Sequence, residues 1–192
     1  VTDPGLRRIT LLTHEDRLVA LLDAHLTPEI GLEDPRGVAV WRAGDDPNDA
    51  VVYVADAGAH GVLALSPKGE VLHRWGTGPG SGDDQFRAPS DVAVSANGDV
   101  FVTEGPEETG LVDLRDAETG ESLRSFVGHE IDINDVAFSA SGLLATTGDD
   151  GALRVWDPDE GKLMFEVVGD GEVWGPSFNA ETNRLSAAWL DE

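Results

Sequence analysis

Residues 35–75 read PRGVAVWRAGDDPNDAVVYVADAGAHGVLALSPKGEVLHRW. Four short runs in this stretch are rich in valine and other apolar residues, and Gly, Pro, Asn and Asp separate them. Such runs between turn-forming residues are typical of β-strands, and strands that follow one another so closely pair in antiparallel order. The stretch therefore predicts a four-stranded antiparallel sheet.

The same pattern returns along the chain, and each unit begins with a short apolar strand. These first strands lie at Val38–Val40, Val92–Val94, Val136–Phe138 and Pro176–Phe178. A unit of this size, repeated about every 40 to 54 residues, indicates a repeat architecture. Residues 89–127 and 131–168 each complete a further four-stranded unit.

The fourth unit is split between the two ends of the chain. Residues 173–192 supply its first two strands, and residues 1–24 supply two strands that lack a first pair. We expect the two pairs to form one sheet and to hold both ends together by strand hydrogen bonds. A helix over residues 15–26 is the competing interpretation, because its leucines would share one face, but the repeat favours a strand at residues 17–23.

The chain is strongly acidic. Its 192 residues include 13 Lys and Arg against 37 Asp and Glu, for a net charge of −24. A surface this negative repels phosphate, which argues against a nucleic-acid partner, and no apolar run is long enough to span a membrane. Cysteine is absent, which excludes disulfides and thiolate chemistry. Met164 is the sole methionine, so we interpret the chain as a processed, excised or engineered segment. Separately, we expect the protein to be cytoplasmic.

Two families of repeat protein share these patterns. Residues 1 to about 105 resemble NHL-repeat propellers, because RGVAV, VYVAD, SPKGE and GTGPGSGDDQFRAPSDVAV follow that family's order. Residues from about 110 to 192 resemble WD-repeat propellers, because GHEIDINDVAFSASGLLATTGDDGALRVWDPDEGKLM carries the Gly-His and Trp-Asp pairs at the expected separation.

The resemblance implies an all-β fold, a β-propeller of four-stranded antiparallel blades with four blade equivalents in one chain. The blades would be NHL-like at residues 35–75, hybrid at 89–127 and WD-like at 131–168. The N- and C-terminal strands would share the last blade, made of residues 173–192 and 1–24, and so close the ring.

The WD resemblance also implies a structural hydrogen-bond chain of His129, Asp150 and Trp156. In that family a Ser or Thr hydroxyl links the His and the Trp, but Gly148 stands at the expected hydroxyl position. We therefore expect an interrupted chain, with a water or Thr147 in compensation. In the preceding blade Arg115 replaces the Trp, so no such chain is expected there.

A catalytic or metal site is hard to assemble from these residues. The five histidines, His14, His25, His60, His73 and His129, show no paired metal-ligand spacing, and the acidic turns do not match a calcium loop. We therefore assign no catalytic residue, no metal site and no cofactor. NHL-type propellers include metal-dependent lyases and lactonases, so the resemblance implies an enzyme of that kind as the alternative, with His60 as the first candidate ligand.

The repeat itself predicts a binding surface. Three residues before the middle of each first strand lie Arg36, Ser90, Asn134 and Trp174, followed by Gly37, Asp91, Asp135 and Gly175. In a propeller these positions reach one face near the central channel, and here their chemistry varies while the framework stays regular. A Trp beside an Arg is typical of a binding hot spot; the alternative is that Trp174 packs between blades.

We interpret the chain as a non-enzymatic scaffold that binds a protein or peptide. The net charge would favour a basic peptide, and NHL and WD patterns that meet inside one blade indicate a recombined or engineered chimera. Three assemblies stay open: a homodimer that forms an eight-bladed ring by exchanging terminal strands, a monomeric four-bladed ring, and a segment of a larger ring.

Overall fold

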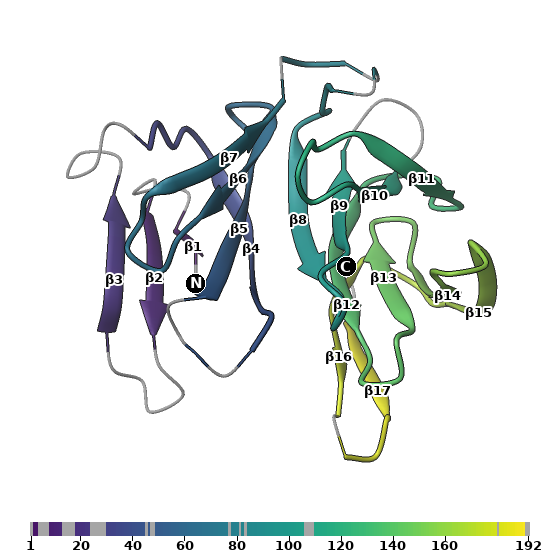
Figure 1. The fold of residues 1–192 in the computed structure, drawn as a ribbon. Helices are drawn as coiled ribbons and strands as arrows, with labels where there is room; N and C mark the ends of the chain where they lie inside the picture. The colour runs from purple at the N-terminus through teal and green to yellow at the C-terminus, as the bar shows by residue number, and fades with distance from the viewer. Residues whose placement is uncertain are drawn as a thin grey trace.

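The computed structural model describes residues 2–3, 8–12, 18–23, 30–44, 46, 49–76, 78–80, 82, 84–105, 110–179 and 181–190. These residues are organised as β-strands joined by turns, in five antiparallel sheets (Figure 1). No helix in this part of the chain is long and apolar enough to cross a membrane.

Three of the sheets have four strands each, paired in chain order. The first holds β4 (Pro35–Arg42), β5 (Ala50–Asp56), β6 (Gly61–Leu65) and β7 (Val71–Trp75). The second holds β8 (Pro89–Val94), β9 (Val100–Glu104), β10 (Leu111–Arg115) and β11 (Ser122–Val127). The third holds β12 (Ile133–Phe138), β13 (Leu144–Gly148), β14 (Ala152–Asp157) and β15 (Lys162–Val168). The predicted four-stranded antiparallel sheets are confirmed, and their strands span residues 35–75, 89–127 and 133–168.

Burial follows the position of each strand in its sheet. The central strands β6, β9 and β13 bury every side chain, whereas the outer strands β7 and β15 expose almost all of theirs. A central strand is covered on both faces by neighbouring sheets, which is why even its polar side chains, such as Thr103 and Thr146, are buried.

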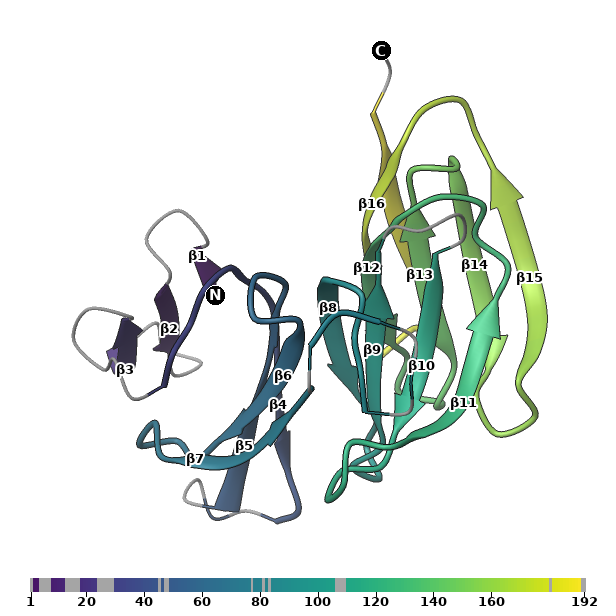
Figure 2. The same cartoon turned by 90° about the horizontal axis from the view of Figure 1, so that it is seen from above.

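The sheets follow one another along an arc with their first strands innermost (Figure 2). β4 lies against β8, β8 against β12, and β12 against β16. Apolar clusters fill the wedges between sheets, with Trp75 and Phe86 between the first and second four-stranded sheets and Phe126 and Trp156 between the second and third. This packing brings the starts of four first strands to one place.

The chain termini form two separate sheets. β1 (Thr2–Asp3), β2 (Arg8–Leu12) and β3 (Leu18–Asp23) make one, and β16 (Val173–Phe178) and β17 (Leu185–Trp189) make the other. The strand at Leu18–Asp23 confirms the strand interpretation over the helix.

The expectation that the two ends share one blade does not hold within the single chain. In the described residues no strand pairing joins β1–β3 to β16–β17, and the two sheets stand apart, with β4–β8 between them (Figure 1). Each terminal sheet is held by its own neighbour: Ile9 of β2 is buried against Val54 and Leu63, and Trp189 of β17 packs against Val155. The arc of sheets set by this packing stays open, so the ends do not meet.

Candidate functional site

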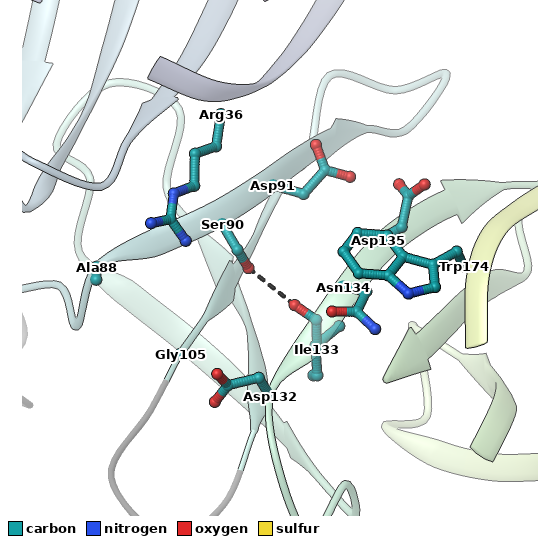
Figure 3. Close-up of a pocket in the computed structure, with 10 residues that line it drawn as sticks. All are labelled: Arg36, Ala88, Ser90, Asp91, Gly105, Asp132, Ile133, Asn134, Asp135 and Trp174. Carbon is teal, nitrogen blue, oxygen red and sulfur yellow. Dashed lines mark hydrogen bonds between the residues drawn. The ribbon is translucent and has the colours of Figure 1, made fainter. Parts of the chain in front are cut away.

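The four predicted binding residues surround one cavity at the inner end of the sheets. The cavity has a volume of about 470 Å³. Four successive first strands contribute to it: Arg36 comes from β4, Ser90 and Asp91 from β8, Asn134 and Asp135 from β12, and Trp174 from β16 (Figure 3). Ala88, Gly105, Asp132 and Ile133 complete the lining.

Two of the four residues are engaged in holding neighbouring sheets together. Ser90 Oγ donates to the carbonyl oxygen of Ile133 at 2.9 Å, and Asn134 Nδ2 donates to the carbonyl oxygen of Val173 at 3.1 Å. Each bond runs from one first strand to the next. Ser90 and Asn134 therefore shape the cavity wall.

The other two residues present exposed side chains. Trp174 is 43% exposed, which is not the burial expected of a side chain packed between blades. Its indole Nε1 donates to Glu172 Oε2 at 3.2 Å, which orients the ring. The Arg36 side chain is 51% exposed and pairs with Asp34 at 3.0 Å.

Carboxylates dominate the charge of the cavity. Burial, followed by a hydrogen bond and the charge of Asp135, raises the pKa of Asp91 well above its usual range. Burial also raises the pKa of Asp132; the charge of Asp149 adds to that rise, and the charge of Arg36 opposes it. Three carboxyl groups thus line a space that holds one arginine.

Sequence reasoning missed the lining residues that come from connections between sheets. Ala88 and Asp132 precede β8 and β12, and Gly105 follows β9. Because connecting loops differ from unit to unit, the repeat carries no signal for them.

The expected hydrogen-bond chain in the third four-stranded sheet is continuous, and the predicted interruption at Gly148 is wrong. Thr146 supplies the hydroxyl: Trp156 Nε1 donates to Thr146 Oγ1 at 3.0 Å, and Thr146 Oγ1 lies 2.8 Å from His129 Nε2. His129 Nδ1 lies 2.9 Å from Asp150 Oδ1. The hydroxyl thus sits two residues earlier than expected, on the same face of the strand.

Crowding explains why glycine occupies position 148. A Cβ atom there would lie 2.6 Å from the Asp132 carbonyl oxygen and 2.8 Å from His129 Nδ1. The expected compensation by Thr147 is also wrong, because the Thr147 hydroxyl is buried without a hydrogen-bond partner.

His129 is neutral in this chain of hydrogen bonds. Burial lowers the pKa of His129. Nδ1 faces both an acceptor, Asp150 Oδ1 at 2.9 Å, and a donor, Arg154 Nη1 at 2.8 Å, and Nε2 lies 2.8 Å from the Thr146 hydroxyl, which can donate or accept. Burial raises the pKa of Asp150, but hydrogen bonds from Arg154, His129 and the Glu130 amide outweigh it and lower the value to about 2.

A different buried cluster replaces this chain in the second four-stranded sheet. Arg115 pairs with Glu104 at 2.7 Å and with Asp113 at 2.8 Å. Its guanidinium also lies 4.3 Å from the centre of the Phe86 ring. Ion pairs and a cation–π contact therefore take the place, in this sheet, of the hydrogen-bond chain that Trp156 and His129 form in the third four-stranded sheet.

His60 serves a structural contact in this structure. Its Nδ1 accepts a hydrogen bond from the Ala88 amide at 3.2 Å, which ties the β5–β6 turn to the segment before β8. The described residues contain no group of three or more His, Asp or Glu side chains that could hold a metal ion.

Comparison with known proteins bears on the fold. The sequence model of the WD domain, G-beta repeat, matches residues 120–157, from β11 to the end of β14. No curated protein matched the chain. The crystal structure of the WD40 beta propeller domain of Doa1 is similar, with a TM-score of 0.69 and 18% identity over 94% of this chain and 54% of that chain. The present chain spans about half the length of that structure. It therefore has the fold of a β-propeller and carries a WD-type repeat at residues 120–157.

Proposed function

We propose that the chain is an interaction scaffold without catalytic activity, and that it binds a protein or peptide in the central cavity. The observation that carries this proposal is the convergence of Arg36, Ser90, Asn134 and Trp174 from four sheets on one open cavity. Ser90 and Asn134 hold the cavity wall together by hydrogen bonds, and the exposed Trp174 ring is accessible to a partner.

The partner is a basic segment. Asp91, Asp132 and Asp135 outnumber Arg36 in the cavity, and the guanidinium of Arg36 is already paired. A lysine or arginine side chain would gain both these carboxylates and the face of Trp174 as a cation–π partner. The net charge of −24 would speed its approach.

Calorimetric titration with a lysine- and arginine-rich heptapeptide tests this function. We expect binding that weakens at high salt, no binding of the matched glutamate peptide, and a loss of about tenfold or more in affinity for Trp174→Ala. Leu123→Ala is the matched control, since Leu123 is exposed on β11 outside the cavity. Equal affinity of the two variants would overturn the proposal.

Three finer assignments stay with this proposal. Residues 1–105 are NHL-type and the rest WD-type, the chain is a recombined or engineered chimera, and it is cytoplasmic. A natural gene in which the NHL-type and WD-type patterns meet at the same point would refute the engineered origin. The alternative of a metal-dependent lyase or lactonase has no supporting ligand cluster in the described residues, and metal analysis of the purified protein tests it directly.

We further propose that a second copy completes the sheet of β16 and β17. The outer strands β7, β11 and β15 each carry one side chain that pairs with the second residue of the third strand of the same sheet. These equivalent side chains are Trp75, Phe126 and Val167. Trp75 and Phe126 are 4% and 2% exposed, because the next sheet covers them through Gly120 and Trp156.

The corresponding surface of β15 is open. Val167 is only partly buried, and Phe165 on the same face is 55% exposed, because among the described residues no third or fourth strand extends β16–β17 to cover them. Strands β2 and β3 of a second copy would supply these strands and give a homodimer with an eight-bladed ring. Light scattering should find about twice the chain mass of 20.3 kDa, and a strictly monomeric species would overturn the dimer.

A further inference from the structure

Two carboxyl groups meet at the centre of the cavity. Asp91 and Asp135 occupy equivalent positions on the neighbouring strands β8 and β12, one residue after Ser90 and Asn134. The Val136 amide nitrogen lies 3.1 Å from Asp91 Oδ2 and 2.9 Å from Asp135 Oδ1. The Val136 N–H group therefore faces two carboxyl groups, and Asp91 also accepts from the Val92 amide. Burial and the neighbouring carboxyl group outweigh the effect of these two bonds on the pKa of Asp91.

The backbone on the other side holds Asp91 in this position. Gly37 of β4 packs so closely that a Cβ atom there would lie 2.3 Å from Asp91 Oδ1 and 2.4 Å from Asp91 Cα. The Asp91 carboxyl group is thus confined between the backbone of β4 and that of β12. It cannot turn away from Asp135 without moving a strand.

The surrounding charges do not neutralise the pair. β4 contributes Arg36, whose guanidinium pairs with Asp34 at 3.0 Å. The segment before β12 contributes Asp132, and the turn after β13 contributes Asp149, whose Oδ1 accepts from Asn134 Nδ2 at 2.7 Å. β16 contributes the uncharged Trp174. The pair is thus flanked by further carboxyl groups.

Two close carboxyl groups of this kind disfavour a second negative charge between them. The burial of Asp91 acts in the same direction, and the pKa of Asp91 is raised accordingly. A cationic side chain in the cavity would supply the missing positive charge and favour the fully ionised pair.

We propose that Asp91 and Asp135 share one proton in the empty cavity and release it to solvent when a lysine or arginine side chain of the partner enters. This inference rests on the proposed function and adds regulation of the same site. Affinity for a basic peptide then rises with pH, by up to about tenfold per pH unit below the raised pKa of Asp91, and levels off above it.

Calorimetry of the lysine- and arginine-rich heptapeptide between pH 4.5 and 8, in buffers of different ionisation enthalpy, measures the released proton directly. We expect close to one proton released per peptide at low pH and none at high pH. In Asp135→Asn the pH midpoint should fall by about one unit or more. Asp170→Asn, which changes an exposed carboxyl group outside the cavity, should keep the proton release.

A titration without peptide separates failure of this inference from failure of the proposed function. In protein labelled with ¹³C at the aspartate carboxyl carbon, NMR should show one carboxyl signal that titrates late and moves in both Asp91→Asn and Asp135→Asn. Peptide binding without proton release, together with two carboxyl groups that titrate independently, would overturn the shared proton. A late-titrating pair in a protein that binds no peptide would leave the pair standing and refute the binding function.

Discussion

One carboxylate fixes the start of each four-stranded sheet. Asp56, Glu104 and Asp150 lie at or just after the end of the second strand of their sheets, and each accepts a hydrogen bond from a backbone amide that precedes the first strand. The donors are Glu33 and Asp34 for Asp56, Arg87 for Glu104, and Glu130 for Asp150. Charge-assisted bonds of this kind are the stronger class of hydrogen bond. Some of the acidic residues of the chain therefore stabilise the fold.

Thr146 and Thr147 are adjacent on β13 and both fully buried, but only Thr146 has hydrogen-bond partners. Thr146→Val should lower the free energy of unfolding by about 1–3 kcal/mol, because it leaves the buried Trp156 Nε1 without an acceptor. Thr147→Val should be neutral or stabilising, because it removes a buried hydroxyl that has no partner. Urea denaturation of the two variants measures both, and equal losses would contradict this account.

Asp150 should make the protein sensitive to acid. Its pKa falls from 3.8 to about 2 in the folded state, so the carboxylate stabilises the fold above its unfolded pKa and this stability is lost as the pH falls from about 4 to 2. The loss amounts to about 2 kcal/mol. Asp150→Asn should be less stable at neutral pH but show a shallower decline over that acid range. Urea denaturation at each pH measures this, and identical slopes for the two proteins would refute the role of Asp150.

At the scale of elements, the sequence predicted the strands well because each sheet is a local structure. Alternating apolar runs and turns sufficed for residues 35–75, 89–127 and 131–168, since every pairing in them joins consecutive strands. The shared terminal sheet required a contact between the two ends of the chain. That contact depends on the angle between successive sheets, which no strand pattern encodes.

The packing of adjacent sheets leaves no room at Gly120, in the β10–β11 turn. Its φ is +76°, and a Cβ atom would lie 2.3 Å from Cγ of Trp75 on the neighbouring sheet. Gly120→Ala should cost about 2–5 kcal/mol, because left-handed strain adds to overpacking. Gly142 has a similar φ of +87° with nothing within 4 Å of a Cβ, so Gly142→Ala should cost only about 1–2 kcal/mol. Thermal denaturation compares them, and equal losses would contradict the crowding at Trp75.

At the scale of the whole molecule, the candidate site was predictable because successive sheets are arranged around a common centre, so equivalent positions of these sheets lie close together. Arg36, Ser90, Asn134 and Trp174 are far apart in sequence, but each stands at the same place in its unit. The buried ion pairs that Arg115 forms with Glu104 and Asp113, at the position where a Trp was expected, could not be predicted in the same way. It depends on side chains from different strands that no single motif unites.

The proposed dimer would bury one face of β15. Phe165 pairs with Val155 and so points toward β16–β17, whereas Val168 pairs with Ala152 and points to the opposite face. Both are exposed in the single chain, at 55% and 62%. If strands of a second copy cover the first face, Phe165→Lys buries an unpaired charge and should convert the dimer to a monomer. Val168→Lys places the same charge on the same strand and should leave the dimer intact. Light scattering at matched concentrations distinguishes the two, and a dimer that survives Phe165→Lys would show that the second copy binds elsewhere.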